Sequence, residues 1–351
     1  MKGKNCREIL SLFKRLISFL EEHANSGPVL GSAILTCLPA AFSGCHQPDH
    51  LSATMENETV LNIKGISKVK ETQGPVDILI FDSNTGRLNT YQRIEQPDSN
   101  RLKASSSEGK MLFTVLANAQ KEAYEWTEIC SREGLESLTV NLEKETRAYP
   151  SMSGECTGFS GSDLDLSLKR TTAEICLRKI SCNFISNAYS GCKIEDPKIY
   201  LVNVNAETPV IGNGSSNAHR IINTGRLNHD DLAKFKDPGI IYQELEQPIG
   251  RDTISPDISL ISYPNHIETE SAGTPVTRLV LEGSIRGKTY FWPININMKG
   301  NGIKGNSIYI YEIHISRPGT SDPDIPVELG EGELIMEVER WNEMEEYGVF
   351  F

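Results

Sequence analysis

Short runs of alternating hydrophobic and polar residues follow one another along most of the chain after residue 60. Between Val76 and Phe81 both odd-numbered and even-numbered positions carry apolar residues, and a turn signal follows at Asn84-Thr85-Gly86. Apolar residues on both faces of a strand indicate that both faces are covered. The segment 76–94 therefore predicts a β-hairpin within a layered β structure such as a sandwich.

The same strand pattern recurs up to the C-terminal end. Further strands are predicted at 109–119, 164–168, 171–185, 197–205, 277–296, 306–316 and 333–341, with the 277–296 hairpin turning at Arg286-Gly287. Helical spacing of apolar residues is confined to 121–138 and to a short stretch at 229–235, where Asn228 is a candidate N-cap. Short strands separated by turn signals favour β-sandwiches with one or two short helices over parallel α/β layers.

A long new strand begins directly after Lys169-Arg170, and the second half then repeats the style of the first. The 351 residues are enough for two domains that each bury a core. We therefore predict an N-terminal β-sandwich domain at 59–169 and a C-terminal β-sandwich domain at 170–351.

The first 45 residues have a different pattern. An uncharged apolar stretch, residues 28–42, follows the basic pair Lys14-Arg15 and precedes Ser43-Gly44-Cys45. This order of basic, apolar and small residues is typical of a secretory signal peptide, predicted at 1–44. Residues 45–58 would then form a polar tether. The alternative interpretation is a buried N-terminal helix.

Charge and cysteine content narrow the function classes. The chain has 35 basic and 47 acidic residues, a formal net charge of −12, which disfavours a nucleic-acid partner. No apolar run after Cys45 approaches the ~20 residues that span a bilayer. Five cysteines follow Cys45, an odd number that argues against a disulfide framework. Cys182 and Cys192 could pair, or Cys176 and Cys182 could share one buried strand face.

Catalytic and cofactor signals are weak. The stretch GNGIKG at 300–305 matches a dinucleotide-binding motif in letters, but a strand rather than a helix follows it. His229-Asp230-Asp231 are adjacent on a helix and point in different directions, so they cannot enclose one metal ion. His314 lies on an alternating strand without a sequence neighbour that would activate it. We predict no catalytic residue, no metal site and no cofactor, and hence no enzyme.

Several stretches occur in a characteristic order along the chain. They are FSGC (42–45), VDILIFDSNTGRL (76–88), VLANA (115–119), YPSMSG (149–154), LDLSLKRTTAEICLRKI (164–180), KIYLVNV (198–204), TRLVLEGSIRGKTYFWPI (277–294), NSIYIYEIHISRPGTSDPDIPV (306–327) and MEVERW (336–341). None of these stretches is specific alone, but in this order they resemble the fimbrillin superfamily, whose members are subunits and anchors of type V pili on certain Gram-negative bacteria.

This resemblance implies two transthyretin-like β-sandwich domains in tandem. It also implies a lipoprotein that is acylated at Cys45, exported to the outer membrane and assembled with other fimbrial subunits into a surface fibre. Such fibres adhere to host or bacterial surface ligands. Assembly in this family proceeds by β-strand addition, in which a protease removes the first strand and a strand from another subunit replaces it.

The sequence leaves the processing step open. Shaft subunits of the family are typically cut after an arginine, but no arginine occurs between Cys45 and Gly86. Lys64, Lys68 and Lys70 are the basic residues of the processing region. A subunit that is cut after lysine would be a pilin, whereas an uncut one would remain a lipidated anchor or assembly terminator.

At the other end, Leu334, Met336 and Val338 share one face of an extended segment. This segment is a candidate donor strand, although ordinary packing at a sheet edge explains its pattern equally well. A different class of function is a lipid-anchored protein that binds surface glycans through loops at the sandwich ends. Its candidate exposed aromatic residues are Trp126, Tyr189 and Tyr263.

Overall fold

In the structure, a computed structural model, all of the described residues belong to one compact unit. The structure describes residues 57–64, 74–119, 129–212, 220–267, 270–271, 273–296, 302–325, 327 and 334–340. The predicted signal peptide, Cys45 and all but the last two residues of the predicted tether lie outside these residues. No described helix has the length and apolar character needed to cross a bilayer.

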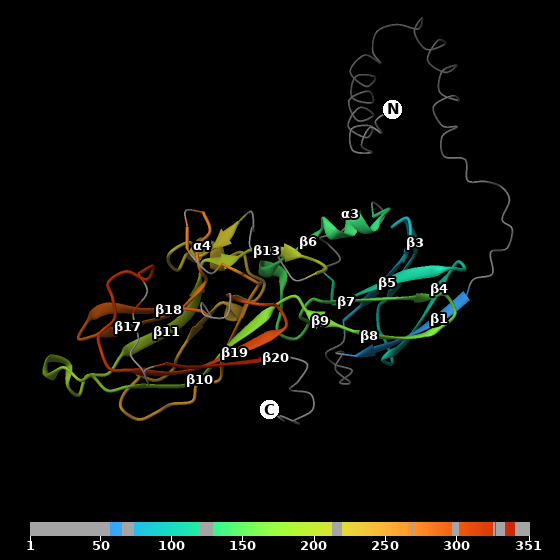
Figure 1. Cartoon of the computed structure of the whole chain (residues 1–351). Coiled ribbons are helices and arrows are strands. Elements are labelled where there is room, and N and C mark those ends of the chain that lie inside the picture. Colours follow the sequence, from blue (N-terminus) through green and yellow to red (C-terminus); the bar gives the residue numbers. More distant parts are fainter. Residues whose placement is uncertain are drawn as a thin grey trace, which may run out of the picture. The chain divides into compact units, whose positions relative to one another are not determined.

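The described part of the chain is mostly β, as predicted, and its elements follow in the order seen in Figure 1. The strands of the N-terminal part are β1 (Asn57–Lys64), β2 (Val76–Asp82), β3 (Leu88–Ile94), β4 (Arg101–Ser106), β5 (Lys110–Ala117), β6 (Thr139–Asn141), β7 (Met152–Phe159), β8 (Asp163–Ser167) and β9 (Lys169–Arg170). The strands that follow are β10 (Ala173–Cys182), β11 (Glu195–Val202), β12 (Val204–Asn205), β13 (Glu207–Pro209), β14 (Ile221–Ile222), β15 (Tyr242–Glu244), β16 (Ile258–Ser262), β17 (Arg278–Ile285), β18 (Lys288–Asn295), β19 (Ser307–Ile315) and β20 (Leu334–Arg340). The described α-helices are α3 (Arg132–Glu136) and α4 (His229–Leu232).

Two sheets form the N-terminal half, which runs from β1 to β9. One has the strand order β4-β1-β8 and the other the order β3-β2-β5-β7-β9. Their facing sides supply one hydrophobic cluster, which includes Leu61, Ile78 and Phe113, all fully buried. Gly154 and Gly158 on β7 allow β8 to approach, since a Cβ on Gly154 would lie 2.4 Å from the carbonyl oxygen of Ser167. The predicted hairpin at 76–94 is confirmed as β2 and β3.

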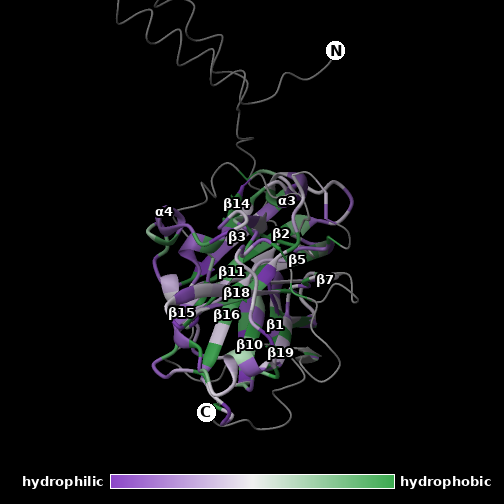
Figure 2. Ribbon diagram, turned by 90° about the vertical axis from the view of Figure 1, so that its left-hand side faces the viewer, coloured by the Kyte–Doolittle hydropathy of each residue, from purple (hydrophilic) through white to green (hydrophobic). Residues whose placement is uncertain are grey.

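The C-terminal half, which begins at β10, also packs two four-stranded sheets. Their strand orders are β16-β10-β19-β20 and β15-β11-β17-β18. Hydrophobic stretches, green in Figure 2, lie among hydrophilic ones in this half, and side chains from both sheets line the core. Large aromatic side chains such as Trp292, Tyr309 and Tyr311 are buried there. The predicted hairpin turn at Arg286-Gly287 is confirmed between β17 and β18.

The two halves share contacts and part of one hydrophobic cluster. Strand β6 pairs with β13, and the cluster that fills the C-terminal half also contains Leu79, Phe81 and Leu116. Glu145 is buried at this junction and accepts hydrogen bonds from the Tyr263 hydroxyl (2.9 Å) and the Ser151 N–H (3.1 Å). Burial raises the pKa of the Glu145 carboxyl above the usual glutamate range. The proposed domain boundary at 169/170 stays a prediction.

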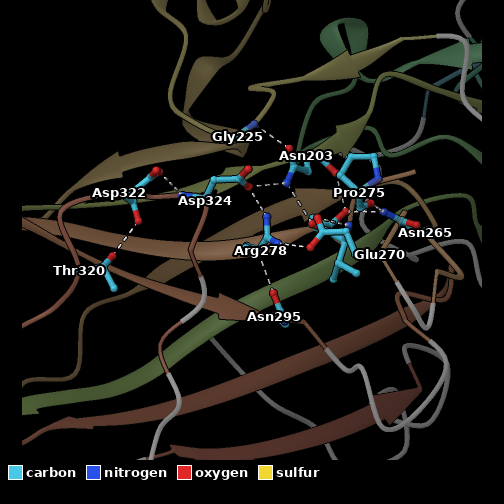
Figure 3. A network of polar contacts seen from close by, with 12 residues as sticks. Asn203, Gly225, Asn265, Glu270, Pro275, Arg278, Asn295, Thr320, Asp322 and Asp324 are labelled. Carbon is cyan, nitrogen blue, oxygen red and sulfur yellow. Dashed lines mark hydrogen bonds and ion pairs between the residues drawn. The ribbon is translucent and has the colours of Figure 1, made fainter. Parts of the chain in front are cut away.

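A buried arginine organises one edge of the C-terminal half (Figure 3). The side chain of Arg278 is 2% exposed and pairs with the carboxylates of Glu270 and Asp324. Its Nε atom donates to Asn295 Oδ1 at 2.9 Å. A buried guanidinium needs such partners because an unpaired charge there would be strongly destabilising. The network thereby holds the segment after β19, which contains Asp324, against β17.

Two local predictions require correction. Residues 121–128 of the predicted helix 121–138 lie outside the described residues. In the described remainder, the helix is shorter than predicted, because α3 begins only after the Ser131 cap. Cys176 and Cys182 do not share a strand face, because a β-bulge between Leu177 and Lys179 changes the side-chain parity of β10. Cys182 is consequently buried in the core, whereas Cys176 is only half-buried.

Candidate strand-exchange site

The first described strand lies in the middle of its sheet. β1 pairs antiparallel with β4, from Asn57 opposite Ser106 to Asn62 opposite Arg101. On its other edge it pairs in parallel with β8, from Val60 opposite Asp163 to Lys64 opposite Ser167. Each edge of β1 is therefore hydrogen-bonded, and in the strand ladder of this sheet β4 and β8 each pair with β1 and not with each other.

Alternate side chains of β1 point into the core. Thr59, Leu61 and Ile63 are 0%, 0% and 3% exposed, while the residues between them face outward or are half-buried. The hydroxyl of Thr59 accepts a hydrogen bond of 2.9 Å from the N–H of Gly161, so this polar atom is satisfied. The two-residue period is that of a strand with one buried face. β1 thus fills the slot between β4 and β8, and three of its side chains, spaced two residues apart, point from this slot into the core.

Ion pairs cover the outward face of β1. Lys103 on β4 pairs with Glu58 at 2.7 Å, and Lys64 pairs with Asp165 on β8 at 3.7 Å. A third pair, between Arg101 and Asp163 at 3.0 Å, joins β4 to β8 directly, across the strand that separates them. All of these groups are more than half exposed, so each pair stabilises the sheet by ~1 kcal/mol at most.

Of the three predicted processing lysines, the structure describes Lys64, whereas Lys68 and Lys70 lie outside the described residues. Lys64 is the last residue of β1, and its side chain is 68% exposed. Its carbonyl oxygen accepts a 2.9 Å hydrogen bond from the N–H of Leu168. The next described residue is Gly74, so all three lysines fall between the buried part of β1 and the rest of the body.

Loss of β1 would create a specific defect in the sheet. The facing edges of β4 and β8 would each present unpaired N–H and C=O groups, and the pockets filled by Leu61 and Ile63 would open. An unpaired strand edge beside an apolar groove is the arrangement that accepts an extended segment from another chain. The slot left by β1 is therefore a candidate site for an incoming strand.

The candidate donor residues lie on the last described strand. β20 pairs antiparallel with β19, from Leu334 opposite Ile313 to Arg340 opposite Ser307. Met336 packs against the core, while Val338 is half exposed. Glu337, on the opposite face, pairs with Arg178 at 3.0 Å. Among the strands that the structure describes, β20 has a neighbour on one side only, so it lies at the edge of its sheet.

The other sequence candidates do not form a site with these strands. Residues 302–305 of GNGIKG, the part that the structure describes, precede β19, and Gly302 has a φ of +71°. His314 Nδ1 lies 2.8 Å from the Ser181 hydroxyl. No group of three metal-ligating side chains occurs among the residues that the structure describes. Tyr263 is buried, Trp126 falls outside the described residues and Tyr189 is half-buried at a sandwich end.

Both cysteines of the suggested pair are free thiols in the structure. Cys182 is buried, and burial raises the pKa of its thiol to about 12. Cys192 is half-buried and packs against the same hydrophobic cluster. Pairing of Cys182 with Cys192 therefore stays an open alternative.

Sequence reasoning missed the Arg101–Asp163 pair, whose members are 62 positions apart. No local pattern marks either residue, because their contact depends on the strand order β4-β1-β8. An alternation of apolar residues identified the strands themselves, but it contains no information about which strand lies between two others.

No protein-family model matches this sequence, and no curated protein matches it either. Solved structures do match. The fimbrilin FimA from Porphyromonas gingivalis aligns with a TM-score of 0.56 at 13% identity, over 81% of this chain and 97% of that one. The tip fimbrial protein Mfa3 from the same species, with a C-terminal truncation, gives 0.51 at 14% identity, over 82% and 100%. A candidate cell adhesion protein from Parabacteroides distasonis gives 0.59 at 15% identity, over 82% and 97%.

These comparisons establish the fold. The chain shares its architecture with fimbrial and adhesion proteins over four fifths of its length. The resemblance to the fimbrillin superfamily that the ordered sequence stretches indicated is therefore confirmed at the level of the fold.

Proposed function

We propose that this chain is a structural subunit of a cell-surface fimbrium of the type V class. It is exported as a lipoprotein acylated at Cys45, carried to the outer membrane and joined to other fimbrial subunits by β-strand addition, in a fibre that mediates adhesion. One observation carries the proposal: β1 is an internal strand, and a lysine-bearing segment connects it to the rest of the body. Shared architecture with fimbrial proteins supports it.

In this mechanism a protease cuts after Lys64, Lys68 or Lys70. Any of the three cuts separates the whole of β1 from the body without touching another described strand. Departure of β1 then leaves the slot between β4 and β8 with three unfilled inward positions. An incoming strand restores the ladder on both edges and buries its own side chains, each apolar one contributing about 1.5–3 kcal/mol.

The candidate donor has the periodicity that the slot requires. Inward positions of β1 are two residues apart at Thr59, Leu61 and Ile63, and the apolar face of β20 repeats at Leu334, Met336 and Val338. As an edge strand, β20 is bonded to one neighbour and can leave its sheet at lower cost than an internal strand. The donor role of β20 remains part of this proposal.

The decisive experiment is intact mass and N-terminal sequencing of the protein from its native envelope. We expect an N-terminus at residue 65, 69 or 71, together with SDS-resistant ladders of the mature form. Lys64→Gln/Lys68→Gln/Lys70→Gln should block maturation, while the matched control Lys103→Gln/Lys110→Gln should leave it intact. A mature protein that begins at Met1, or ladders that persist after deletion from residue 333 onward, would contradict the proposal.

A second candidate role is a permanently lipidated anchor that terminates the fibre. Two observations favour it: no arginine stands between Cys45 and Gly86, and the carbonyl of Lys64 is bonded within the sheet. A protease requires its target backbone in an unpaired, extended form, so Lys64 is a poor site while β1 is in place. The same experiment distinguishes the two roles, because an anchor begins at an acylated Cys45 and retains β1.

A further inference from the structure

One end of the C-terminal half carries cations that the fold holds in a defined place. The β17–β18 hairpin turns at Arg286 and Gly287, whose φ values are +52° and +77°. Positive φ at both central residues is the geometry of a tight two-residue hairpin turn. The turn places Arg286 and Lys288 at the tip, and both residues are exposed.

Two tyrosines support these cations. The guanidinium carbon of Arg286 lies 5.9 Å from the ring centroid of Tyr189, and Lys288 Nζ lies 5.1 Å from that of Tyr290. Such cation–π contacts hold a charged group over an aromatic face while leaving its outer side open to solvent. The rings are themselves fixed, since Tyr189 packs edge-on against Tyr290 with centroids 6.4 Å apart. The tip is therefore an ordered surface.

The tyrosine hydroxyls form a small polar centre between the cations. Their oxygens lie 3.0 Å apart, so one hydroxyl donates to the other. The hydrogen bond with Tyr290 raises the pKa of Tyr189, and that hydroxyl keeps its proton at neutral pH. Because only one of the two protons is used within the pair, the second can be donated to an acceptor on a ligand.

More basic residues reach the same end from neighbouring loops. Ile194, the neighbour of Lys193, packs against Gly283 of β17, and the side chain of Lys193 runs beside Gly250, which precedes Arg251. Carboxylates of Glu195 and Asp252 are also close in sequence. Even so, within the described part of the chain no ion pair forms with Lys193, Arg251, Arg286 or Lys288.

These features favour a particular ligand chemistry. Four cations without carboxylate partners are unusual on a chain whose net charge is −12, and they attract anions. The supporting surface is a narrow hairpin tip with a half-buried ring, which is small beside the ~800 Å² per partner of a stable protein interface. An acidic sugar chain needs only a few contacts for each sugar unit, namely a cation for its anionic group, the edge of an aromatic ring and a hydroxyl that donates a hydrogen bond.

We propose that this end, defined by Tyr189, Arg286, Lys288 and Tyr290, binds an acidic polysaccharide through its carboxylate or sulfate groups. Arg286 and Lys288 pair with the anionic groups, and the tyrosine pair donates its spare proton to a ring or hydroxyl oxygen of the sugar. The site lies on the β17–β18 hairpin and on the segment between β10 and β11, none of which takes part in the proposed strand exchange, so it is independent of how the subunit assembles.

The test uses the full chain purified in mild detergent and immobilised surfaces of heparin, polygalacturonate, neutral dextran and poly-L-glutamate. We expect binding to heparin, to polygalacturonate or to both, weakening as salt rises, and none to dextran. The variant Arg286→Gln/Lys288→Gln should lose about tenfold in affinity, the sum of two exposed pairs. The control Arg87→Gln/Lys110→Gln removes the same charge from the N-terminal half and should change affinity less than twofold.

Three outcomes would overturn the proposal. One is binding to neither acidic polysaccharide above the dextran level. Another is an equal loss in both double variants, which would assign the attraction to overall charge. The third is binding to poly-L-glutamate alone, which would make the end a docking site for an acidic protein segment.

Discussion

The buried face of β1 contributes to the stability of the N-terminal half through Leu61. Leu61 is 0% exposed and packs between the two sheets of the N-terminal half, whereas its neighbour Val60 points to the other face and is half-buried. Leu61→Ala removes three carbons from a fully buried position and leaves a cavity, which costs about 2–5 kcal/mol. Val60→Ala loses less buried area and some strand propensity, at a cost of ~1 kcal/mol.

Equilibrium urea unfolding of the chain that begins at residue 46 measures both values. We expect Leu61→Ala to lower the free energy of unfolding by at least twice as much as Val60→Ala, without a change in the slope of the transition. Equal losses, or a larger loss for Val60→Ala, would refute the assignment of the inward face. That outcome would also remove the basis for the register of an incoming strand.

Three further predictions concern other parts of the fold. Burial raises the pKa of Glu145 in the folded protein. The contribution of protonated Glu145 to stability is therefore fully present below the ordinary glutamate pKa and is lost as pH rises through the folded pKa. Thermal denaturation across that pH window should show a smaller fall in melting temperature with rising pH for Glu145→Gln than for the unchanged protein. Asp324→Asn leaves Arg278 with one carboxylate fewer and should cost about 1–3 kcal/mol in unfolding free energy, reduced because Asp324 is half exposed. Gly319→Ala would place a Cβ 2.1 Å from the Phe291 carbonyl oxygen, and limited proteolysis should detect a loosened segment after β19.

Strand content could be predicted from the sequence with good success, because each strand carries its signal locally. The hairpin turn at Arg286-Gly287 and the Asn228 cap of α4 were predicted, and the structure confirms both. The bulge in β10 was not foreseen. A bulge inserts one residue and leaves the hydrophobic pattern on either side of it intact, so the sequence does not reveal it. Cys176 and Cys182 are an even number of positions apart, yet their side chains lie on opposite faces of β10 because of this bulge.

The candidate site was predictable only in part. The three lysines and the apolar face of the last strand are visible in the sequence, because both are local features. That β1 is internal, with a parallel neighbour on one side, depends on pairing with residues about 100 positions away. The ion pair between Arg101 and Asp163 follows from that strand order, and long-range pairing of this kind is what local patterns do not encode.

The position of the candidate processing lysines determines what the proposed cut would accomplish. In the uncut chain β1 is tethered to its own slot, which gives it an effective concentration in the millimolar range for a short connection. A donor strand from another subunit with similar contacts cannot compete against that advantage. Cleavage after Lys64, Lys68 or Lys70 leaves β1 with every contact it had, yet it makes its return bimolecular. The proposed cut would therefore act by removing the tether, and donor affinity would decide the exchange only once β1 is no longer part of the same chain.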